Sequence, residues 1–421
     1  MINVAILGVG TVGTAVAKIL EENRDIIRAR AGKEINPVVG VVRNLNKSRD
    51  VNIEITDSAD SILERDDIDI VVELLGGVDE PYRVVKKALE NGKSVVTANK
   101  ALLAYKRYEL QDIAGEIPFE FEASVAGGIP IINALRDGLS ANHIDSIKGI
   151  MNGTSNYILT EMIQKGADFS ETLKIAQDLG YAEADPTFDI GGFDAGHKLL
   201  ILASIAYGID AKPEDILIEG IENISSEDID FAREFGYSIK LLGIAKKDGD
   251  EVEIRVNPTL LPNSEMIAKI DGVMNGISVI GDRVGETLYY GAGAGGDATA
   301  SAVVANLIDI VRQDKKSPML GFKKALENGE LKLKNRLDIK TNYYIRIHVE
   351  DRAGVLAEIS KIFGEFEISI ETLLQKGGKA ENTNLLILTH KTRESNIISA
   401  LEKIQTLETV KEKPFMIRVE K

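Results

Sequence analysis

The stretch MINVAILGVGTVGTAVAKIL (residues 1–20) decides the fold of the amino-terminal part of the chain. A short apolar run ends at Leu7, three glycines follow in G-x-G-x-x-G spacing, and a helical pattern then continues to about residue 30. Glycines at this spacing permit a tight bend, let the backbone approach a pyrophosphate, and let helix and strand pack closely. The amino terminus of the helix offers free N–H groups to the phosphates. The predicted dinucleotide contacts are Gly8, Gly10, Thr11, Val12 and Gly13.

Strands and helices alternate from this stretch to about residue 130. Strand patterns over 36–44, 67–77 and 93–100 are separated by helical patterns. The alternation predicts an α/β fold in which helices cover both faces of a parallel sheet and ligands bind beyond the carboxyl ends of its strands. We therefore expect a Rossmann-type nucleotide-binding domain over residues 1–130, completed by about 285–315. The glycine turn in that last segment, with Gly295 as its candidate contact, is expected to pack back against the cofactor.

Two cationic residues stand at expected strand ends. Arg43 occupies a position where an NAD-specific enzyme normally carries an acid, and a guanidinium suits a 2′-phosphate. The residue therefore favours NADP, with NAD still possible, although a solvated arginine at a strand end is the alternative. Lys100 could bridge cofactor and substrate, or could be a solvated residue that opens the next helix, and the sequence logic does not decide between these interpretations.

Glu122 is a single acid in an expected strand before a two-glycine turn. A carboxylate followed by small residues could hold a hard cation, with backbone carbonyls completing the oxygen shell. The commoner explanation of such an acid is a helix cap, and the residue pattern alone favours the cap.

The pattern changes after about residue 137. A strand over 143–151 is followed by a loop over 152–156 and two helical patterns, and sheet-like segments follow between residues 251 and 296. This order predicts an α+β catalytic and dimerisation domain over 131–285. A lysine-rich connector over 316–341 is predicted to be a linker that contains a short helix.

The stretch GYAEADPTFDIGGFDAGHK (180–198) concentrates acids before a strongly apolar helix. Asp194 and Lys198 are four residues apart at the start of that helix, so their side chains point the same way. One interpretation is a capping aspartate in a surface-type salt bridge. The other is a proton-transfer site, in which the acids bind a substrate ammonium and Lys198 exchanges a proton with the reacting oxygen.

The carboxyl-terminal residues 342–421 show a strand–helix–strand–strand–helix–strand order, which predicts a ferredoxin-like fold. Over the whole chain of 421 residues, 50 basic and 66 acidic residues give a net charge of -16, which disfavours nucleic acid or an anionic membrane as partner. There is no cysteine, so thiol chemistry is excluded. With no apolar run long enough to span a bilayer, the composition predicts a cytoplasmic protein that binds small molecules and like subunits.

Five motifs carry a resemblance to homoserine dehydrogenase over nearly the whole chain: the glycine turn, TANKALLA (97–104), FEASVAGGIPII (121–132), IMNGTSNYIL (150–159) and the acidic stretch at 180–198. The resemblance implies NAD(P)-dependent interconversion of L-aspartate 4-semialdehyde and L-homoserine, a step toward threonine, methionine and isoleucine. Aspartate-semialdehyde dehydrogenase is excluded because it needs a cysteine. Another amino-acid or hydroxy-acid dehydrogenase, or a non-catalytic amino-acid sensor, remains the alternative, and the presence of both lysines argues for an enzyme.

The resemblance also implies roles by position. Lys198 is similar to the family's catalytic proton donor, and Lys100 to the second lysine of the site. The implied substrate ligands are Glu183, Asp194 and Asp189, and Gly180 is an implied cofactor contact. Glu122 with the backbone carbonyls of Val125, Gly127 and Ile129 matches a site for sodium or potassium, which favours a cation over a simple cap. Asp185 has no implied role.

DRAGVLAEIS (351–360) resembles an ACT domain, where amino acids bind at strand–helix junctions, often between paired modules. The candidate effector contacts are Asp351, Ala353, Gly354, Val355 and Leu356, and threonine is the expected effector. A dimerisation module without a ligand is the alternative, and a homodimer or homotetramer is expected. Asp297 and Ala298 stand where many relatives have a proline, so the loop over the cofactor is expected to differ in shape.

Overall fold

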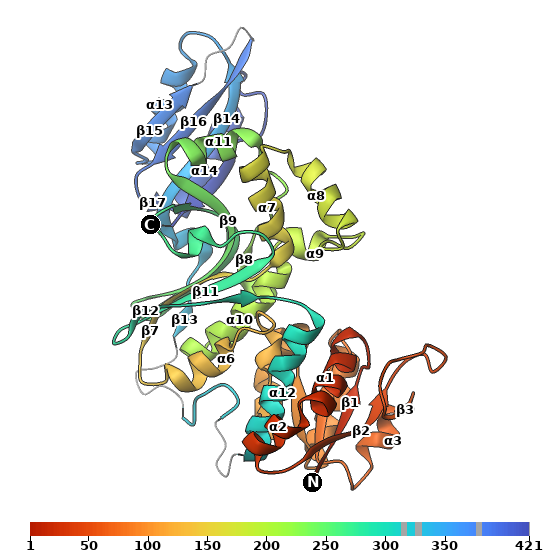
Figure 1. The fold of residues 1–421 in the computed structure, drawn as a ribbon. Coiled ribbons are helices and arrows are strands. Elements are labelled where there is room, and N and C mark those ends of the chain that lie inside the picture. Colours follow the sequence, from red (N-terminus) through yellow and green to blue (C-terminus); the bar gives the residue numbers. More distant parts are fainter. Residues whose placement is uncertain (313–317, 325–330, 376–380, 421) are drawn as a thin grey trace. The chain divides into compact units, whose positions relative to one another are not determined.

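The computed structural model describes residues 1–312, 318–324, 331–375 and 381–420 (Figure 1). The chain divides into two compact units. The first unit consists of Met1–Gly153, Asp194–Asp215 and Val273–Leu331, and the second of Thr154–Phe193, Ile216–Gly272 and Lys332–Lys421. Each unit therefore joins parts of more than one predicted domain. Within the described ranges, no helix combines the length and the hydropathy that a membrane crossing requires.

A six-stranded parallel sheet in the order β3-β2-β1-β4-β5-β6 organises the first unit. Its strands are β1 (Ile2–Leu7), β2 (Ile35–Val41), β3 (Glu54–Thr56), β4 (Ile70–Glu73), β5 (Ser94–Thr97) and β6 (Phe119–Glu120). The order reverses between β1 and β4, which is where this class of sheet binds its ligands. The predicted Rossmann-type fold is confirmed.

Helices cover this sheet and bury its apolar strands. They are α1 (Thr11–Glu22), α2 (Arg24–Ala31), α3 (Ala59–Leu63), α4 (Asp79–Glu90), α5 (Lys100–Ala114) and α12 (Gly296–Arg312), and a short α6 (Ile131–Asn133) follows the last strand of the sheet in the sequence. Val16 of α1 and Val303 of α12 share one core with Ile6 of β1, and Figure 1 shows the two helices next to each other. The helix predicted to continue to about residue 30 is interrupted at Asn23, whose φ of -102° and ψ of 22° are not helical.

Three antiparallel strands and one long helix complete the first unit. The strands are β7 (Ile144–Ile150), β11 (Met274–Gly281) and β12 (Gly285–Ala292), in the order β12-β11-β7. The helix α10 (Phe193–Tyr207) is buried along most of its length and enters this unit at Asp194. Burial on all sides explains why its sequence is almost continuously apolar.

The second unit contains the remaining helices of the middle of the chain and a mixed sheet. The helices are α7 (Gly153–Lys165), α8 (Phe169–Asp178), α9 (Thr187–Ile190) and α11 (Ser226–Glu234), and the strands are β8 (Leu217–Ile218), β9 (Tyr237–Asp248), β10 (Glu251–Pro262) and β13 (Lys332–Leu333). The loop predicted over 152–156 is wrong, because α7 already begins at Gly153. Its Thr, Ser and Asn residues occupy a first helical turn, where such residues are common.

The carboxyl-terminal segment has the predicted strand and helix order. Its elements are β14 (Lys340–Glu350), α13 (Val355–Glu365), β15 (Ile370–Gln375), β16 (Asn382–Thr389), a short β17 (Thr392–Arg393), α14 (Glu394–Gln405) and β18 (Phe415–Val419). The strands lie in the order β18-β14-β16-β15, and both helices share one core with the sheet. The ferredoxin-like prediction is confirmed.

This segment is continuous with the rest of the second unit, because β18 pairs in parallel with β10. Residues 316–317 and 325–330 of the predicted linker lie outside the described residues. The described part of the linker contains β13, which also pairs with β10.

Candidate active site

The glycine turn after β1 has the geometry of a phosphate site. Gly8 has a φ of 105°, and a Cβ there would lie 2.6 Å from the carbonyl oxygen of Leu74. A Cβ on Gly13 would lie 2.2 Å from the carbonyl oxygen of Gly8, so helix and strand approach too closely for a side chain. A Cβ on Gly10, by contrast, would meet no described atom within 4 Å. This open space beside the first N–H groups of α1 fits a pyrophosphate.

The loop after β2 is tied to this turn by an arginine that the sequence analysis did not single out. Arg49 donates from Nε to the carbonyl oxygen of Val9 at 2.9 Å and from Nη1 to that of Asn44 at 3.0 Å. Arg43 lies in the same loop with its side chain exposed to solvent. Two guanidinium groups therefore stand in the loop where the ribose end of a dinucleotide is expected.

The second glycine turn packs against the first. Gly295 has a φ of 128°, and a Cβ on Gly296 would lie 3.1 Å from Cγ2 of Thr11. Asp297 and Ala298 belong to the first turn of α12 rather than to a loop. An acid in a first helical turn is favourable to the helix dipole, so Asp297 suits its position in α12.

Asp194 joins two lysines from different parts of the chain. Its Oδ2 lies 2.7 Å from Nζ of Lys198 one helical turn later, and its Oδ1 lies 2.5 Å from Nζ of Lys100 at the start of α5. Asn152 donates from Nδ2 to Oδ2 at 2.9 Å, and Lys198 also donates to the carbonyl oxygen of Met151 at 2.6 Å. The predicted contact between Asp194 and Lys198 is confirmed, and Lys100 joins it.

This cluster combines deep burial with strong charge pairing. Asp194 is 2% exposed, whereas the side chain of Lys100 is 35% exposed. Burial by itself would raise the pKa of Asp194, but Lys198 and Lys100 outweigh it and hold that pKa well below its usual range. The neighbouring His197 is also buried, and burial together with Lys100 lowers the pKa of its imidazole. The arrangement keeps an ionised carboxylate beside two amino groups at any ordinary pH.

A buried carboxylate that the sequence analysis did not single out supports Lys100. Glu73, fully buried at the end of β4, accepts a hydrogen bond from the hydroxyl of Thr97 at 2.6 Å. The backbone N–H of Asn99 donates to the same hydroxyl at 3.0 Å, and the Asn99 side chain caps α5 by accepting from the N–H of Leu102. The detectable signal was a lone acid closing an apolar strand, at the edge where ligands bind.

Glu122 has a capping role in the structure. It lies in a 3-10 turn (Glu122–Ser124), not in a strand, because β6 already ends at Glu120. Its two carboxylate oxygens accept the N–H groups of Ile132 at 2.7 Å and Asn133 at 2.9 Å. The side chain is buried, and this burial raises its pKa to about 7. A charge placed here has no directly bonded cationic partner among the described residues, which fits a bound cation.

The predicted carbonyl ligands lie in the turn that follows Glu122. Gly127 has a φ of 55°, and a Cβ there would lie 2.8 Å from the carbonyl oxygen of Gly293. Val125 and Ile129 flank it, and the carbonyl of Ile129 accepts from the N–H of Ile131 at 2.8 Å. The turn is tightly folded, and carbonyl oxygens of this kind suit an alkali cation.

The remaining acids of the predicted substrate site belong to the second unit. Gly180, with a φ of 76°, follows α8 and starts the acidic loop. The carbonyl of Glu183 accepts from Nε2 of Gln177 at 3.1 Å, and its side chain is exposed. The carbonyl of Asp189 accepts from the hydroxyl of Ser155 at 2.9 Å. The loop is therefore fixed through its backbone.

Asp185 gains a structural role. Its Oδ1 accepts the N–H of Thr187 at 3.1 Å and the hydroxyl of Thr187 at 2.6 Å, at the start of α9. These bonds lower the pKa of Asp185. Asp185 thus stabilises the turn that leads into α9, whose N-cap position is Pro186.

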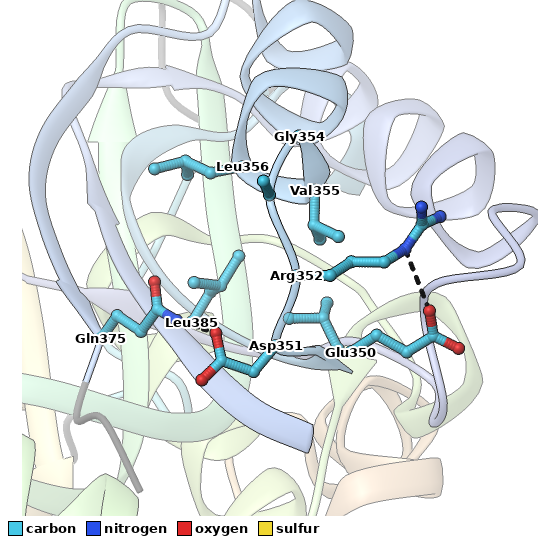
Figure 2. A pocket seen from close by; sticks show the side chains of 10 residues that line it. Glu350, Asp351, Arg352, Gly354, Val355, Leu356, Gln375 and Leu385 are labelled. Atoms are coloured by element: carbon cyan, nitrogen blue, oxygen red, sulfur yellow. Dashed lines mark hydrogen bonds and ion pairs between the residues drawn. The ribbon is translucent and has the colours of Figure 1, made fainter. Parts of the chain in front are cut away.

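A cavity of about 260 Å³ lies at the junction of β14 and α13 (Figure 2). All five predicted effector contacts line it: Asp351, Ala353, Gly354, Val355 and Leu356. Gln375 donates to Asp351 at 3.1 Å, while Arg352 turns to Glu350 in an ion pair of 3.1 Å. The cavity therefore combines the amino terminus of α13, the carboxylate of Asp351, the ion pair of Glu350 with Arg352, and apolar side chains.

Comparisons with known proteins agree with this organisation. The family model described as homoserine dehydrogenase matches residues 130–308, that of the homoserine dehydrogenase NAD-binding domain matches 8–117, and that of the ACT domain matches 343–409. The homoserine dehydrogenase of Helicobacter pylori is 55% identical over 420 residues, covering 100% of this chain and 99% of the relative.

Solved structures agree as well. A homoserine dehydrogenase from Thiobacillus denitrificans is 46% identical with a TM-score of 0.95, covering 100% of this chain and 98% of that one. A hyperthermophilic archaeal homoserine dehydrogenase in complex with NADPH is 29% identical with a TM-score of 0.63, covering 73% and 97%. The chain belongs to the homoserine dehydrogenase family.

Proposed function

We propose that the protein catalyses the reversible, NAD(P)H-dependent reduction of L-aspartate 4-semialdehyde to L-homoserine, a step toward threonine, methionine and isoleucine. The observation that carries the proposal is Asp194, buried and ion-paired to both Lys198 and Lys100, in the unit that also contains the glycine turn. The glycine turn at 8–13 would hold the nicotinamide cofactor, which would supply a hydride to the aldehyde carbon. Lys198 then donates a proton from Nζ to the oxygen on which negative charge develops.

Other residues of the chain hold the reactants. Asp194 keeps the Lys198 ammonium oriented, and Lys100 lies on the more exposed side of the same carboxylate. Glu183 and Asp189 bind the amino-acid end of the substrate, which turns its distal carbon toward the cofactor. The backbones of Gly8, Gly10, Gly180 and Gly295 contact the cofactor, and Arg43 binds the 2′-phosphate of NADP. The bound NADPH of the archaeal relative supports that preference.

The experiment that tests this function mixes purified protein with L-homoserine and either NADP or NAD, and follows the formation of reduced nicotinamide. We expect turnover with both nucleotides and a lower KM for NADP. Absence of turnover with either one, with and without potassium or sodium, would contradict the proposal.

We also propose a sodium or potassium ion held by Glu122 and the carbonyls of Val125, Gly127 and Ile129. Without a cation, the raised pKa of Glu122, about 7 against an ordinary 4.5, means that the free energy of unfolding falls as pH rises from about 4.5 to about 7. A bound cation reverses this loss, because it stabilises the ionised carboxylate. Potassium chloride is therefore expected to raise the thermal midpoint clearly at pH 8 and little at pH 5.5.

Glu122→Gln should remove this potassium effect at pH 8, with choline chloride as the control for ionic strength. The matched variant is Glu120→Gln, because Glu120 is also buried but already pairs with Arg136 at 2.9 Å. It should keep the potassium-dependent increment even if its midpoint is lower. An equal response of both variants would argue against the cation site.

For the cavity at α13, we propose that an amino acid, with threonine as the expected feedback inhibitor, places its carboxylate at the helix amino terminus and its ammonium on Asp351. Titration calorimetry should detect threonine binding, and Asp351→Asn should weaken it by about tenfold or more, since a charge-assisted hydrogen bond is lost. Valine, which has the shape of threonine without its hydroxyl, is the matched ligand. Absence of threonine binding at millimolar concentration would leave the module as a dimerisation element of a homodimer or homotetramer.

A further inference from the structure

Arg418 is a buried arginine that connects the carboxyl-terminal strand to two carboxylates. Arg418 lies in β18 and is 1% exposed. Nε donates to Oε2 of Glu394 at 2.9 Å and Nη2 donates to Oε1 of Glu394, while Nη1 and Nη2 donate to the two carboxylate oxygens of Glu219 at 2.6 and 3.2 Å. Both partners lie in the second unit, Glu394 at the start of α14 and Glu219 just after β8.

The two carboxylates play different parts. Glu394 is 2% exposed and also accepts the hydroxyl of Tyr343 at 2.6 Å, so it supplies the charge that a buried guanidinium requires. The side chain of Glu219 is 38% exposed and would be well solvated without Arg418. Its two-pronged bond helps to support the buried charge of Arg418, whose pKa it raises, although Glu219 itself does not depend on the bond to stay solvated. The bond also holds the segment that carries Glu219 in one place.

That segment, residues 219–221, is packed backbone to backbone against the turn at 190–192. The N–H of Ile221 donates to the carbonyl of Ile190 at 2.9 Å. A Cβ on Gly220 would lie 2.5 Å from the same carbonyl oxygen, and one on Gly192 would lie 3.2 Å from the carbonyl oxygen of Glu219. On its other side, Glu219 donates its N–H to the carbonyl of Val256 in β10 at 2.8 Å. A displacement of Glu219 would therefore also displace the turn at 190–192.

The turn at 190–192 lies between two groups of proposed site residues. It follows Asp189 directly, and it leads into α10, whose first turns carry Asp194 and Lys198. We propose that Arg418 and Glu219 are positioning residues for the acidic loop, so that the last strand of the carboxyl-terminal module helps to set the substrate site. The expected change in KM rests on the proposed function, whereas the expected change in the mobility of the acidic loop rests on packing alone.

The test uses the full-length protein and the variant Glu219→Gln, which keeps size and hydrogen-bonding atoms but loses the charge. We expect the KM for L-homoserine to rise at least about threefold, the scale of a lost partly exposed ion pair, while kcat changes less than the KM. The dissociation constant for NADP, measured without substrate, should change less than the KM for L-homoserine, because the glycine turn at 8–13 is untouched. Amide hydrogen exchange in peptides over 183–198 should become faster, and exchange over 8–22 should not.

The matched control is Glu365→Gln. Glu365 is 39% exposed, belongs to the same carboxyl-terminal module and pairs with Lys403 away from this network, so its variant should behave as wild type. Arg418→Lys keeps a charge for Glu394 but loses the forks to both carboxylates. It should lower the thermal midpoint and also reproduce the rise in homoserine KM of Glu219→Gln, and the double variant should raise that KM little further.

Wild-type homoserine KM and wild-type exchange in Glu219→Gln would overturn the inference. Because exchange is measured without substrate, its result stands apart from catalysis. Failure of the wild-type protein to oxidise homoserine would refute the proposed function, while faster exchange over 183–198 would still support the positioning role.

Discussion

Lys198→Met is expected to lower turnover of L-homoserine by roughly 10²- to 10⁴-fold, the usual contribution of a positioned acid–base group. Methionine keeps an unbranched apolar side chain in the space of the lysine stem, so the helix packing around residue 198 should survive. The ammonium that lies 2.7 Å from Asp194 is lost, and with it the proton for the developing alkoxide. The KM for NADP should stay close to the wild-type value, because the glycine turn is untouched. Steady-state kinetics in both directions measure these effects.

A buried lysine can also matter for stability alone, and Lys240 provides the matched control. It is 1% exposed and donates to the carbonyl of Ile270 at 2.6 Å and to Asp271 at 2.8 Å, within the second unit. Lys240→Met should lower the thermal midpoint while the folded enzyme keeps its turnover. Near-normal turnover in Lys198→Met, or an equal loss in both variants, would refute the role given to Lys198.

The sequence predicts best what depends on local spacing. The i, i+4 relation between Asp194 and Lys198 indicates their contact, because a helix repeats every 3.6 residues. Hydrophobic periodicity is equally local, which is why the parallel sheet and the ferredoxin-like module could be predicted element by element. Glu122 shows the limit of local patterns: an alternating run predicts a strand, but the residue lies in a 3-10 turn, where its carboxylate binds two backbone N–H groups ten and eleven residues later.

Contacts between distant segments depend on the topology of the fold, and the sequence predicts only part of that topology. Lys100 could be placed at the carboxyl end of a strand, but its pairing with a residue 94 positions later depends on where α10 enters the first unit. The same holds for Asn152, and for Arg418 with Glu219. The sequence did not predict the role of Glu73 for a different reason. An apolar run does not show that an acid at its end is buried unless the hydrogen-bond partners of that acid, here Thr97 and Asn99, are known.

Asp194→Asn is expected to have the second largest effect, because it leaves two neighbouring lysines without their shared carboxylate. Breaking a buried ion pair from one side typically costs about 3–5 kcal/mol, and the two amino groups would also repel each other. The neutral amines become more favourable, so the alkaline limb of the pH profile for aldehyde reduction should move to lower pH. Urea unfolding and pH–rate profiles measure the two consequences.

The pH dependence of the free energy of unfolding distinguishes the charge pairing of Asp194 from simple packing. Since the pKa of Asp194 is held well below its usual range, its stabilising contribution is fully present above about pH 4, the ordinary aspartate value, and is lost as pH falls further. The difference in unfolding free energy between wild type and Asp194→Asn should therefore be constant between pH 5 and 8 and shrink below pH 4. Asp185→Asn makes the same chemical change at a carboxylate bonded to Thr187 alone among the described residues, and should stay within about 0.5 kcal/mol of wild type. If Asp194→Asn instead kept both the wild-type profile and the wild-type stability, the carboxylate would not be what holds Lys198 and Lys100 in their charged forms.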